Sequence, residues 1–421
     1  MQVAIIGAGI VGVTTAYELA VQGHEVAVFE RRASVASEGS FANAGVMAPG
    51  YVTPWAAPGM AWKVLRHAFS RDTPVRLGGL GGLRALAQAP WLWRWWRACR
   101  PQLHVANRAA MQGLAQFSRQ RTLELTHKLR LEYEQAQGYL VLLRSERELA
   151  AAQAGLRLLR ELGVDHAVID ARRCHQLEPA LNAATPLHAA IHLPQDGVGN
   201  CRQFAHLIKA EAQRLGVVFR FDTDVQALTA GQRPALRTTA GEAWSFDAVV
   251  VCAGVQANAV LSSVGVKLPL APVYGYSVTA PLRHVDGHAP LGPRAALMDE
   301  RFKVAISRLG QRVRVAGGAE IGGRAEDMRL APLRTLYRVL DEWFPGSTVT
   351  REAQQWKGAR PMLPDGPPVL GESGAPGVWL NLGHGSSGWA LACGSARVLA
   401  ERISGRAAPI DTSRLTASRW R

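Results

Sequence analysis

The feature that most constrains the fold is the N-terminal segment, where a short apolar run leads into three spaced glycines. Residues 3–6 have the length of a buried strand, and Gly7, Gly9 and Gly12 complete a GxGxxG pattern where a helix would begin. Gly7 allows a tight turn, Gly9 lets the backbone approach a pyrophosphate, and Gly12 lets the helix pack closely on the strand. The segment predicts a strand, turn and helix of a parallel α/β fold.

The residues that follow complete a dinucleotide-binding unit. Residues 11–22 have helical apolar spacing, and Gly23 ends that helix. Residues 25–29 alternate as a strand and lead to Glu30, about twenty residues beyond the glycines, where a carboxylate can accept both ribose hydroxyls. An acidic residue here disfavours a 2′-phosphate, although Arg31 and Arg32 weaken that argument. The alternative is a βαβ unit that binds no ligand.

Composition narrows the class of protein. A chain of 421 residues exceeds one core and predicts two domains, and 48% hydrophobic residues suffice to form them. The net charge of +15 favours anionic ligands, but no zinc-finger spacing or basic zipper is present, so we expect no nucleic-acid partner. The five cysteines form no CxxC pair, which predicts no metal site. Without a secretory signal, we expect the protein in the cytoplasm.

Two segments after Glu30 suggest functional surfaces. Residues 37–59 form a long loop of Gly, Pro and small residues, which would allow backbone to lie against a flat ring. Residues 60–135 read as mostly helical and contain the Trp- and Arg-rich segment 91–100. One interpretation is a packed helix whose Arg side chains lie along its apolar surface with their charged ends in solvent. The other is an interfacial helix that contacts the inner face of the cell membrane or a quinone-bearing partner.

The remaining chain alternates between two sheets. Residues 245–254 read as a strand returning to the nucleotide fold, where Ala253 and Gly254 would pass close to the ligand. Residues 274–280, 302–307 and 312–318 alternate as in an antiparallel sheet, which a helix at 330–344 closes. Near the C-terminus, a strand, a Gly-rich turn and a helix at 387–403 direct N–H groups at an electron-rich ligand.

Taken together, these motifs resemble the D-amino acid oxidase-like flavoprotein superfamily and, within it, the bacterial D-amino acid dehydrogenases. The resemblance covers nearly the whole chain. It is carried by the N-terminal glycines with Glu30 and by ANAGVMAPGYVTPWAAPG, MDERFKVAISR, RVRVAGGAEI, GARPMLPDGPP and NLGHGSSGW. It implies FAD rather than NAD.

The resemblance also implies an α/β fold with two domains. One is a Rossmann-like, glutathione-reductase-like FAD-binding domain, and the other is a mixed α+β substrate domain with an antiparallel sheet. We divide the chain accordingly, with the FAD-binding domain at 1–56, 194–268 and 346–421 and the substrate-binding domain at 57–193 and 269–345.

The predicted cofactor-binding residues fall into groups along the chain. The resemblance assigns the ADP half of FAD to the first turn and Glu30, the flavin approach to the loop at 40–45, the adenine to the backbone of residue 225, and the flavin pyrimidine to the turn at 383–388. The complete predicted set is Gly7, Ala8, Gly9, Ile10, Val11, Gly12, Glu30, Arg31, Ser40, Asn43, Ala44, Gly45, Val225, Ala253, Gly254, Gly383, His384, Gly385, Ser386, Ser387 and Gly388.

The resemblance further implies a substrate site. Arg360 in GARP aligns with the Arg that grips a substrate carboxylate, a role that a planar guanidinium suits. Phe302 stands where relatives commonly carry a Tyr, a hydroxyl that Tyr51, Tyr274 or Tyr276 could replace. The candidate catalytic residues are Arg360, Tyr276 and His384, and the candidate substrate-binding residues are Arg360, Tyr51, Tyr274 and Phe302.

The implied reaction is oxidative deamination of D-amino acids to 2-oxo acids and ammonia. Hydride would pass from Cα to flavin N5, and a quinone or another respiratory acceptor would then take the electrons. Three alternatives remain. The first is dehydrogenation of D-hydroxyproline or another cyclic imino acid, the second is a flavin-carrying subunit without its own turnover, and the third is an NAD-dependent dehydrogenase.

Overall fold

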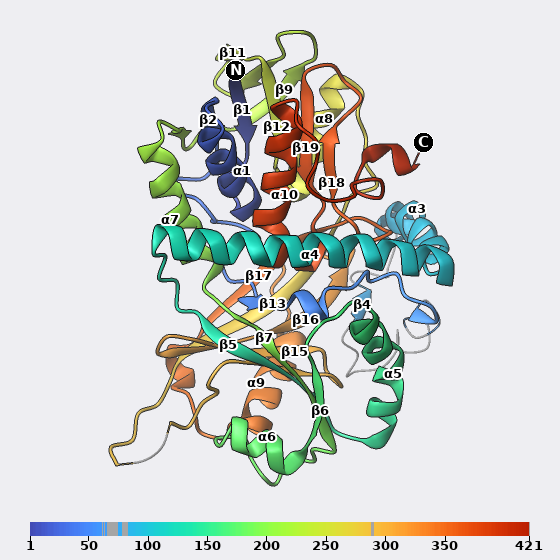
Figure 1. Ribbon diagram of the computed structural model, residues 1–421, viewed down its shortest axis with the longest axis vertical. Helices are drawn as coiled ribbons and strands as arrows, with labels where there is room; N and C mark the ends of the chain where they lie inside the picture. Colours follow the sequence, from blue (N-terminus) through green and yellow to red (C-terminus); the bar gives the residue numbers. More distant parts are fainter. Residues whose placement is uncertain (61, 63, 65–74, 78–82, 288–289, 421) are drawn as a thin grey trace.

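The computed structural model describes residues 1–60, 62, 64, 75–77, 83–287 and 290–420. It contains a six-stranded sheet at one end, a larger sheet at the other, and a long helix that crosses between them (Figure 1). This crossing helix is α4 (Pro101–Leu129). Among the described residues, no helix combines the length and apolar character needed to cross a membrane.

The six-stranded sheet is the nucleotide-binding sheet that the N-terminal motif predicts. Its strands pair in parallel except for the antiparallel edge pair β18–β19. In spatial order they are β18 (Val369–Glu372), β19 (Val378–Leu382), β12 (Ala248–Val251), β1 (Gln2–Ile6), β2 (Glu25–Phe29) and β8 (Val218–Arg220). Helices α1 (Ile10–Val21), α7 (Cys201–Arg214) and α10 (Gly388–Ile403) pack together beside this sheet.

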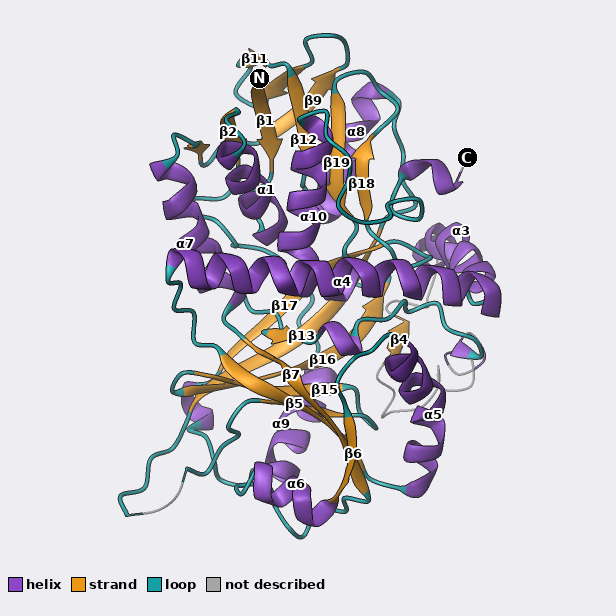
Figure 2. Ribbon diagram, in the orientation of Figure 1, coloured by secondary structure: helices purple, strands orange, loops and turns teal. Residues whose placement is uncertain are grey.

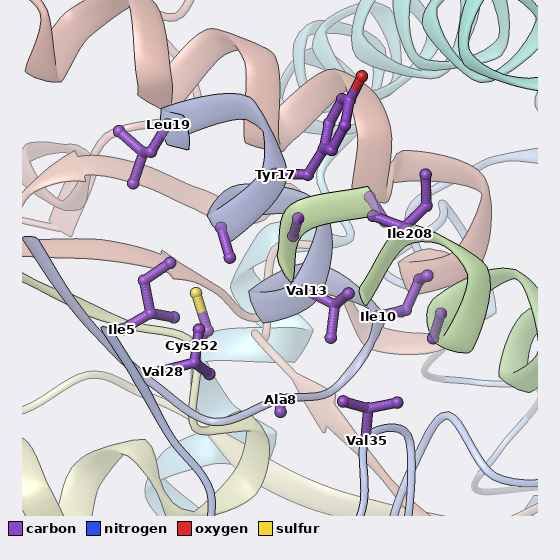
Figure 3. Packing of buried hydrophobic residues seen from close by; sticks show 14 of the residues in the cluster. Ile5, Ala8, Ile10, Val13, Tyr17, Leu19, Val28, Val35, Ile208 and Cys252 are labelled. Atoms are coloured by element: carbon purple, nitrogen blue, oxygen red, sulfur yellow. The ribbon is translucent and has the colours of Figure 1, made fainter. Parts of the chain in front are cut away.

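The core between this sheet and α1 explains the strand and helix periodicities. Ile5 and Val28 from the strands pack with Val13 of α1 in one buried cluster (Figure 3). Adding a Cβ to Gly12 would place it 1.9 Å from the carbonyl oxygen of Gly7. Only glycine therefore permits this close approach of helix and turn.

Within the described part of the chain, the larger sheet has ten strands and is mostly antiparallel. Its main path is β17 (Gln354–Met362), β13 (Ala271–Pro281), β16 (Arg312–Ile321), β15 (Val304–Leu309), β14 (Ala296–Asp299), β5 (Ala136–Leu143), β7 (Ala189–Val198) and β3 (Val46–Met47), with β4 (Val75–Leu77) paired to β16 and β6 (Ala167–Asp170) paired to β7. The two sheets and the helices around them confirm the predicted α/β fold class (Figure 2).

Shorter elements complete the two ends. Near the nucleotide sheet lie α8 (Ala257–Leu261) and the antiparallel strands β9 (Val225–Thr229), β10 (Ala235–Thr238) and β11 (Ala243–Ser245). Around the larger sheet lie α3 (Leu83–Ala98), α5 (Glu146–Glu161), α6 (Ala171–Leu177) and α9 (Leu330–Trp343). The strand pairing differs from the predicted domain division at β17 and β3, which we placed in the FAD-binding domain but which pair with β13 and β7 of the larger sheet. The division remains a proposal.

Candidate functional site

A cavity of about 1770 Å³ lies between the two sheets. Its walls include the turn after β1, the loop at 37–58, the centre of β13 and β17, and the turn that leads into α10. Sites for drug-sized ligands enclose about 300–1,000 Å³, so this cavity has room for a ligand larger than those. Among the described residues, no group of three or more His, Cys, Asp or Glu is arranged to hold a metal ion.

The turn after β1 forms a cradle that suits a pyrophosphate. Gly7 has a positive φ of 99°, and a Cβ there would lie 2.8 Å from the carbonyl oxygen of Cys252. A Cβ on Gly9 would meet a single nearby atom, Ser40 Oγ at 3.6 Å, so the space beside Gly9 is open. At the start of α1 the N–H of Ile10 donates to Ser40 Oγ, and the first turn of a helix leaves further N–H groups without an intrahelical partner, which can bind a phosphate.

Glu30 lies at the end of β2 and borders the cavity. One carboxylate oxygen accepts a hydrogen bond from the backbone N–H of Ala8 at 2.7 Å, and the other from that of Arg32 at 2.9 Å. Burial raises the pKa of Glu30, while these two N–H groups lower it. The two N–H donors fix the carboxylate in an orientation that leaves lone pairs for ribose hydroxyls.

The loop at 40–45 is fastened to the start of α1 and to the larger sheet. Ser40 Oγ accepts a hydrogen bond from the N–H of Ile10 at 3.1 Å. The Ser277 hydroxyl donates to the carbonyl of Ala42 at 2.8 Å, and Arg314 donates to the carbonyl of Asn43 at 3.0 Å. Sequence reasoning missed Ser277 and Arg314, because their partners are backbone carbonyls more than 200 residues away in the chain.

The turn before α10 forms the other end of the cavity. Gly383 and Gly385 both have positive φ, and a Cβ at either would collide with Leu363 or Met362. The turn therefore brings its backbone within reach of a ligand, as its glycine pattern predicts. Its N–H groups and the start of α10 present a partial positive charge to the cavity.

His384 of this turn is buried and fixed in place. One ring nitrogen, Nε2, lies 3.0 Å from the Ser395 hydroxyl, and burial lowers the His384 pKa to about 3. The imidazole is therefore neutral across physiological pH. Predicted as a catalytic candidate, His384 instead has the contacts of a residue that holds the turn against α10.

We expect this burial to appear in the pH dependence of stability. Between pH 6.5 and about 3, His384 is protonated in the unfolded chain but not in the folded chain. The free energy of unfolding is therefore unaffected by protonation of His384 above pH 6.5 and decreases as the pH is lowered through this range. The free energy of unfolding of His384→Gln, measured relative to that of wild type, should therefore rise by about 1.4 kcal/mol for each pH unit by which the pH is lowered in this range. Denaturant unfolding of both proteins at pH 7, 6 and 5 measures the difference. A difference independent of pH would contradict this assignment.

Arg360 projects from β17 at the opposite wall of the cavity. Its guanidinium lies over Gly275, where a Cβ would be 2.3 Å from Arg360 Nη2, and it donates to the carbonyl of Gly318 at 2.8 Å. Burial lowers its pKa to about 10. No described Asp or Glu forms an ion pair with it, so an unpaired cation borders the cavity. Gly275 and Gly318 were not predicted, although glycines flanked by strand residues signal such a close approach.

The tyrosines of β13 are placed differently from Arg360. Arg360 is paired with Val273 in the sheet register, and side chains alternate between faces along a strand. The Tyr276 hydroxyl donates to buried Glu320 at 2.5 Å, and the Tyr274 ring faces the ammonium of Lys357. Both residues contribute to the cavity lining. These contacts are with Glu320 and Lys357 rather than with the guanidinium of Arg360.

Tyr51 and Phe302 lie further along the larger sheet. The Tyr51 hydroxyl donates to Glu300 at 2.8 Å and receives a hydrogen bond from Lys303 at 3.1 Å. The Phe302 ring packs beneath the guanidinium groups of Arg144 and Arg338. Both residues border the cavity, but Phe302 also belongs to the hydrophobic cluster around α9.

The structure brings nearly all predicted cofactor residues to one cavity. The exceptions are Ala8 and Gly12, which are buried behind the turn. All five predicted catalytic or substrate-binding side chains other than His384 lie on the larger sheet's side: Tyr51, Tyr274, Tyr276, Phe302 and Arg360.

A dinucleotide-binding sheet that faces a second sheet across a shared cavity is the arrangement of a class of dinucleotide-dependent oxidoreductases. The family model described as FAD dependent oxidoreductase matches residues 2–402, and the chain belongs to this family. The cofactor is FAD, and the open space beside Gly9 and the glycine-lined turn at 383–388 fit its pyrophosphate and its ring.

Relatives and solved structures agree with this family. The chain is 41% identical to a D-amino acid dehydrogenase of Rhizorhabdus wittichii and 40% identical to one of Rhizobium rhizogenes, over 100% of both chains in each case. The fold is similar to that of glycine oxidase from Geobacillus kaustophilus, with a TM-score of 0.75 and 20% identity over 99% of this chain and 98% of that one.

Proposed function

We propose that this protein catalyses the FAD-dependent oxidative deamination of D-amino acids to 2-oxo acids and ammonia. The full-length similarity to D-amino acid dehydrogenases supports this reaction. The observation that carries it is the guanidinium of Arg360, which forms no ion pair with a described Asp or Glu and borders the cavity opposite the dinucleotide cradle. A carboxylate is the partner that such a buried cation lacks.

Arg360 would orient the substrate as well as bind it. Its Nη1 is committed to the carbonyl of Gly318, which fixes the plane of the guanidinium and leaves other N–H groups for a carboxylate. Two parallel hydrogen bonds to that carboxylate fix the position of Cα. The flavin, when bound, supplies the acceptor for the hydride of the Cα–H bond.

The proposed reaction needs no protein side chain as a general base. An amino acid bound as the neutral amine would lose a hydride from Cα to the flavin and a proton from nitrogen to solvent water, which gives the imino acid. Water then converts the imino acid to the 2-oxo acid and ammonia. His384, neutral and bonded to Ser395, would maintain the turn rather than transfer this proton.

The test is an anaerobic titration of the purified holoenzyme with matched D- and L-amino acids. We expect D-enantiomers to bleach the flavin absorbance and L-enantiomers to leave it unchanged. A flavoprotein that no amino acid bleaches would instead be a flavin-carrying subunit. Faster bleaching by cis-4-hydroxy-D-proline than by any primary D-amino acid would favour a cyclic imino-acid dehydrogenase.

We also propose that the electrons pass to a quinone-type acceptor at the membrane. The Trp- and Arg-rich helix α3 supports this proposal because it has two unlike faces. Trp91 and Trp95 are 6% and 7% exposed, whereas Trp93 and Trp96 are 54% and 57% exposed. Exposed arginines flank the outer pair, namely Arg94, Arg97 and Arg100. This face combines the aromatic and basic residues of an interfacial helix.

The membrane proposal predicts reversible binding to anionic vesicles. We expect the wild-type protein to co-sediment with phosphatidylglycerol vesicles at low salt, and Trp93→Ser with Trp96→Ser to reduce the bound fraction several-fold. Added salt should release the protein, since screening weakens the basic contribution. Leu215→Ser, at an exposed position at the end of α7, is the control. Equal binding by the Trp variant and the control would contradict the role of α3.

A further inference from the structure

Several apolar residues that line the cavity lie on the same face of the larger sheet as Arg360. Val273 is paired with Arg360 on one side and with Ile321 on the other, and Ala319 is paired with Val75 of β4. Residues paired across neighbouring strands share one face of a sheet, and two positions along a strand are only about 6.6 Å apart. The register therefore places Ala319 and Ile321 on the face of the sheet that carries Arg360.

The walls of an apolar lobe of the cavity come from segments around this face. We define the apolar lobe as the cavity-lining residues Met60, Val64, Val75, Trp95, Ala319 and Ile321. All six belong to, or pack against, one hydrophobic cluster that also contains Trp91 and Met362. Helix α3, which supplies Trp95, and strand β4 lie near the same end of α4 (Figure 1).

Among the described residues, the lobe has no acidic group that would pair with a positively charged side chain. The acidic residues that border the cavity, among those the structure describes, lie on other segments: Glu30, Glu38, Glu161, Asp224 and Glu300. A lysine-like or arginine-like side chain placed beside Ala319 would therefore be desolvated without a partner.

From this arrangement we infer that the apolar lobe holds the substrate side chain and that the preferred substrates are D-amino acids with apolar side chains of three or more carbons. The inference rests on the proposed function, since it requires the substrate carboxylate on Arg360. Each added methylene would remove apolar surface from water against Trp95 and Ile321. One methylene changes specificity by about 10-fold or more in a hydrophobic pocket.

The first test is a homologous series with the holoenzyme. We expect kcat/KM to rise from D-alanine through D-2-aminobutyrate to D-norvaline, by about 10-fold per methylene. D-Leucine should exceed D-asparagine, which has nearly the same shape, because among the six lobe residues only the indole N–H of Trp95 could bond the amide, and the amide NH₂ would be buried without an acceptor. A flat or falling series would overturn the inference. A preference for D-glutamate would also overturn it, and would point to Arg108, a cavity-lining cation of α4.

Two substitutions alter the lobe in opposite directions. Ala319→Leu fills its floor and should lower the ratio of kcat/KM for D-norvaline to that for D-alanine by about 10-fold or more. Ile321→Ala enlarges the lobe and should raise the ratio for D-phenylalanine to D-norvaline. Ala210→Leu, at an exposed position of α7, is the control for the added volume. Unchanged ratios in both lobe variants, with full FAD content, would contradict the inference.

A binding measurement separates this inference from the proposed function. Unreactive straight-chain carboxylates from acetate to hexanoate should perturb the flavin spectrum with Kd values that tighten as the chain lengthens. Failure of every D-amino acid to bleach the flavin would remove the proposed function, whether or not this trend appears. If D-alanine bleaches the flavin but neither Kd nor kcat/KM depends on chain length, the proposed function stands and the assignment of the lobe to the substrate side chain is wrong.

Discussion

Replacing Arg360 with alanine should lower kcat/KM for D-amino acids by about 10²–10⁴-fold. Two charge-assisted hydrogen bonds to the substrate carboxylate contribute about 1.5–3 kcal/mol each, and each 1.4 kcal/mol corresponds to a factor of ten. Most of the change should be in KM, because the guanidinium holds the carboxylate before and during hydride transfer. Steady-state rates with a soluble dye as electron acceptor measure both parameters.

The controls for this prediction separate binding from folding. Arg360→Lys keeps the charge but loses the planar pair of donors, so its kcat/KM should lie between those of wild type and Arg360→Ala. Arg237→Ala, at an exposed position of β10, should behave as wild type. FAD content should be unchanged in all three, because Arg360 lies at the wall opposite the dinucleotide cradle. A wild-type KM in Arg360→Ala would remove the residue from carboxylate binding.

The N-terminal unit could be predicted nearly residue by residue. Residues 25–29 are the strand that the alternation predicts, and α1 begins at Ile10, one residue before the predicted start. The reason is local: glycine conformation, capping and apolar period act within a few residues and do not depend on the rest of the chain. The same holds for the glycine-rich turn before α10.

The placement of β17 could not be predicted from local pattern. The GARP segment lies close in sequence to the C-terminal turn, which favoured assigning it to the nucleotide domain. Its pairing with β13 joins residues about 90 positions apart, from Val273 to Arg360, and no sequence period reports such a partner. Strand pairing over this distance depends on the whole fold.

The side-chain orientations on β13 could not be predicted from the sequence for a related reason. A register irregularity between Tyr274 and Tyr276 changes how this strand faces its neighbour β16. A tyrosine hydroxyl near a carboxylate site is a reasonable prediction from sequence, but strand alternation and this irregularity decide which face it reaches. In the structure the Tyr276 hydroxyl is bonded to Glu320, a buried residue that the sequence did not single out.

The two glycines of the first turn should respond differently to alanine, although a single motif contains both. At Gly12 a Cβ would lie 1.9 Å from the carbonyl oxygen of Gly7, so the backbone must move. We expect Gly12→Ala to lower the free energy of unfolding by about 3 kcal/mol or more, with or without FAD. Thermal unfolding of the FAD-free and FAD-loaded protein measures this loss.

At Gly9 the expected loss is of cofactor affinity rather than of stability. A Cβ there meets Ser40 Oγ at 3.6 Å, which is ordinary contact, so the FAD-free Gly9→Ala protein should lose no more than about 1 kcal/mol. The added methyl would stand between the pyrophosphate and the N–H groups of the turn, which should weaken FAD binding by about 10–100-fold. Flavin fluorescence titration of the FAD-free protein gives the Kd. Wild-type affinity in Gly9→Ala would mean that the pyrophosphate does not lie against this turn. A loss of stability equal to that of Gly12→Ala would mean that the space beside Gly9 is not open to a ligand.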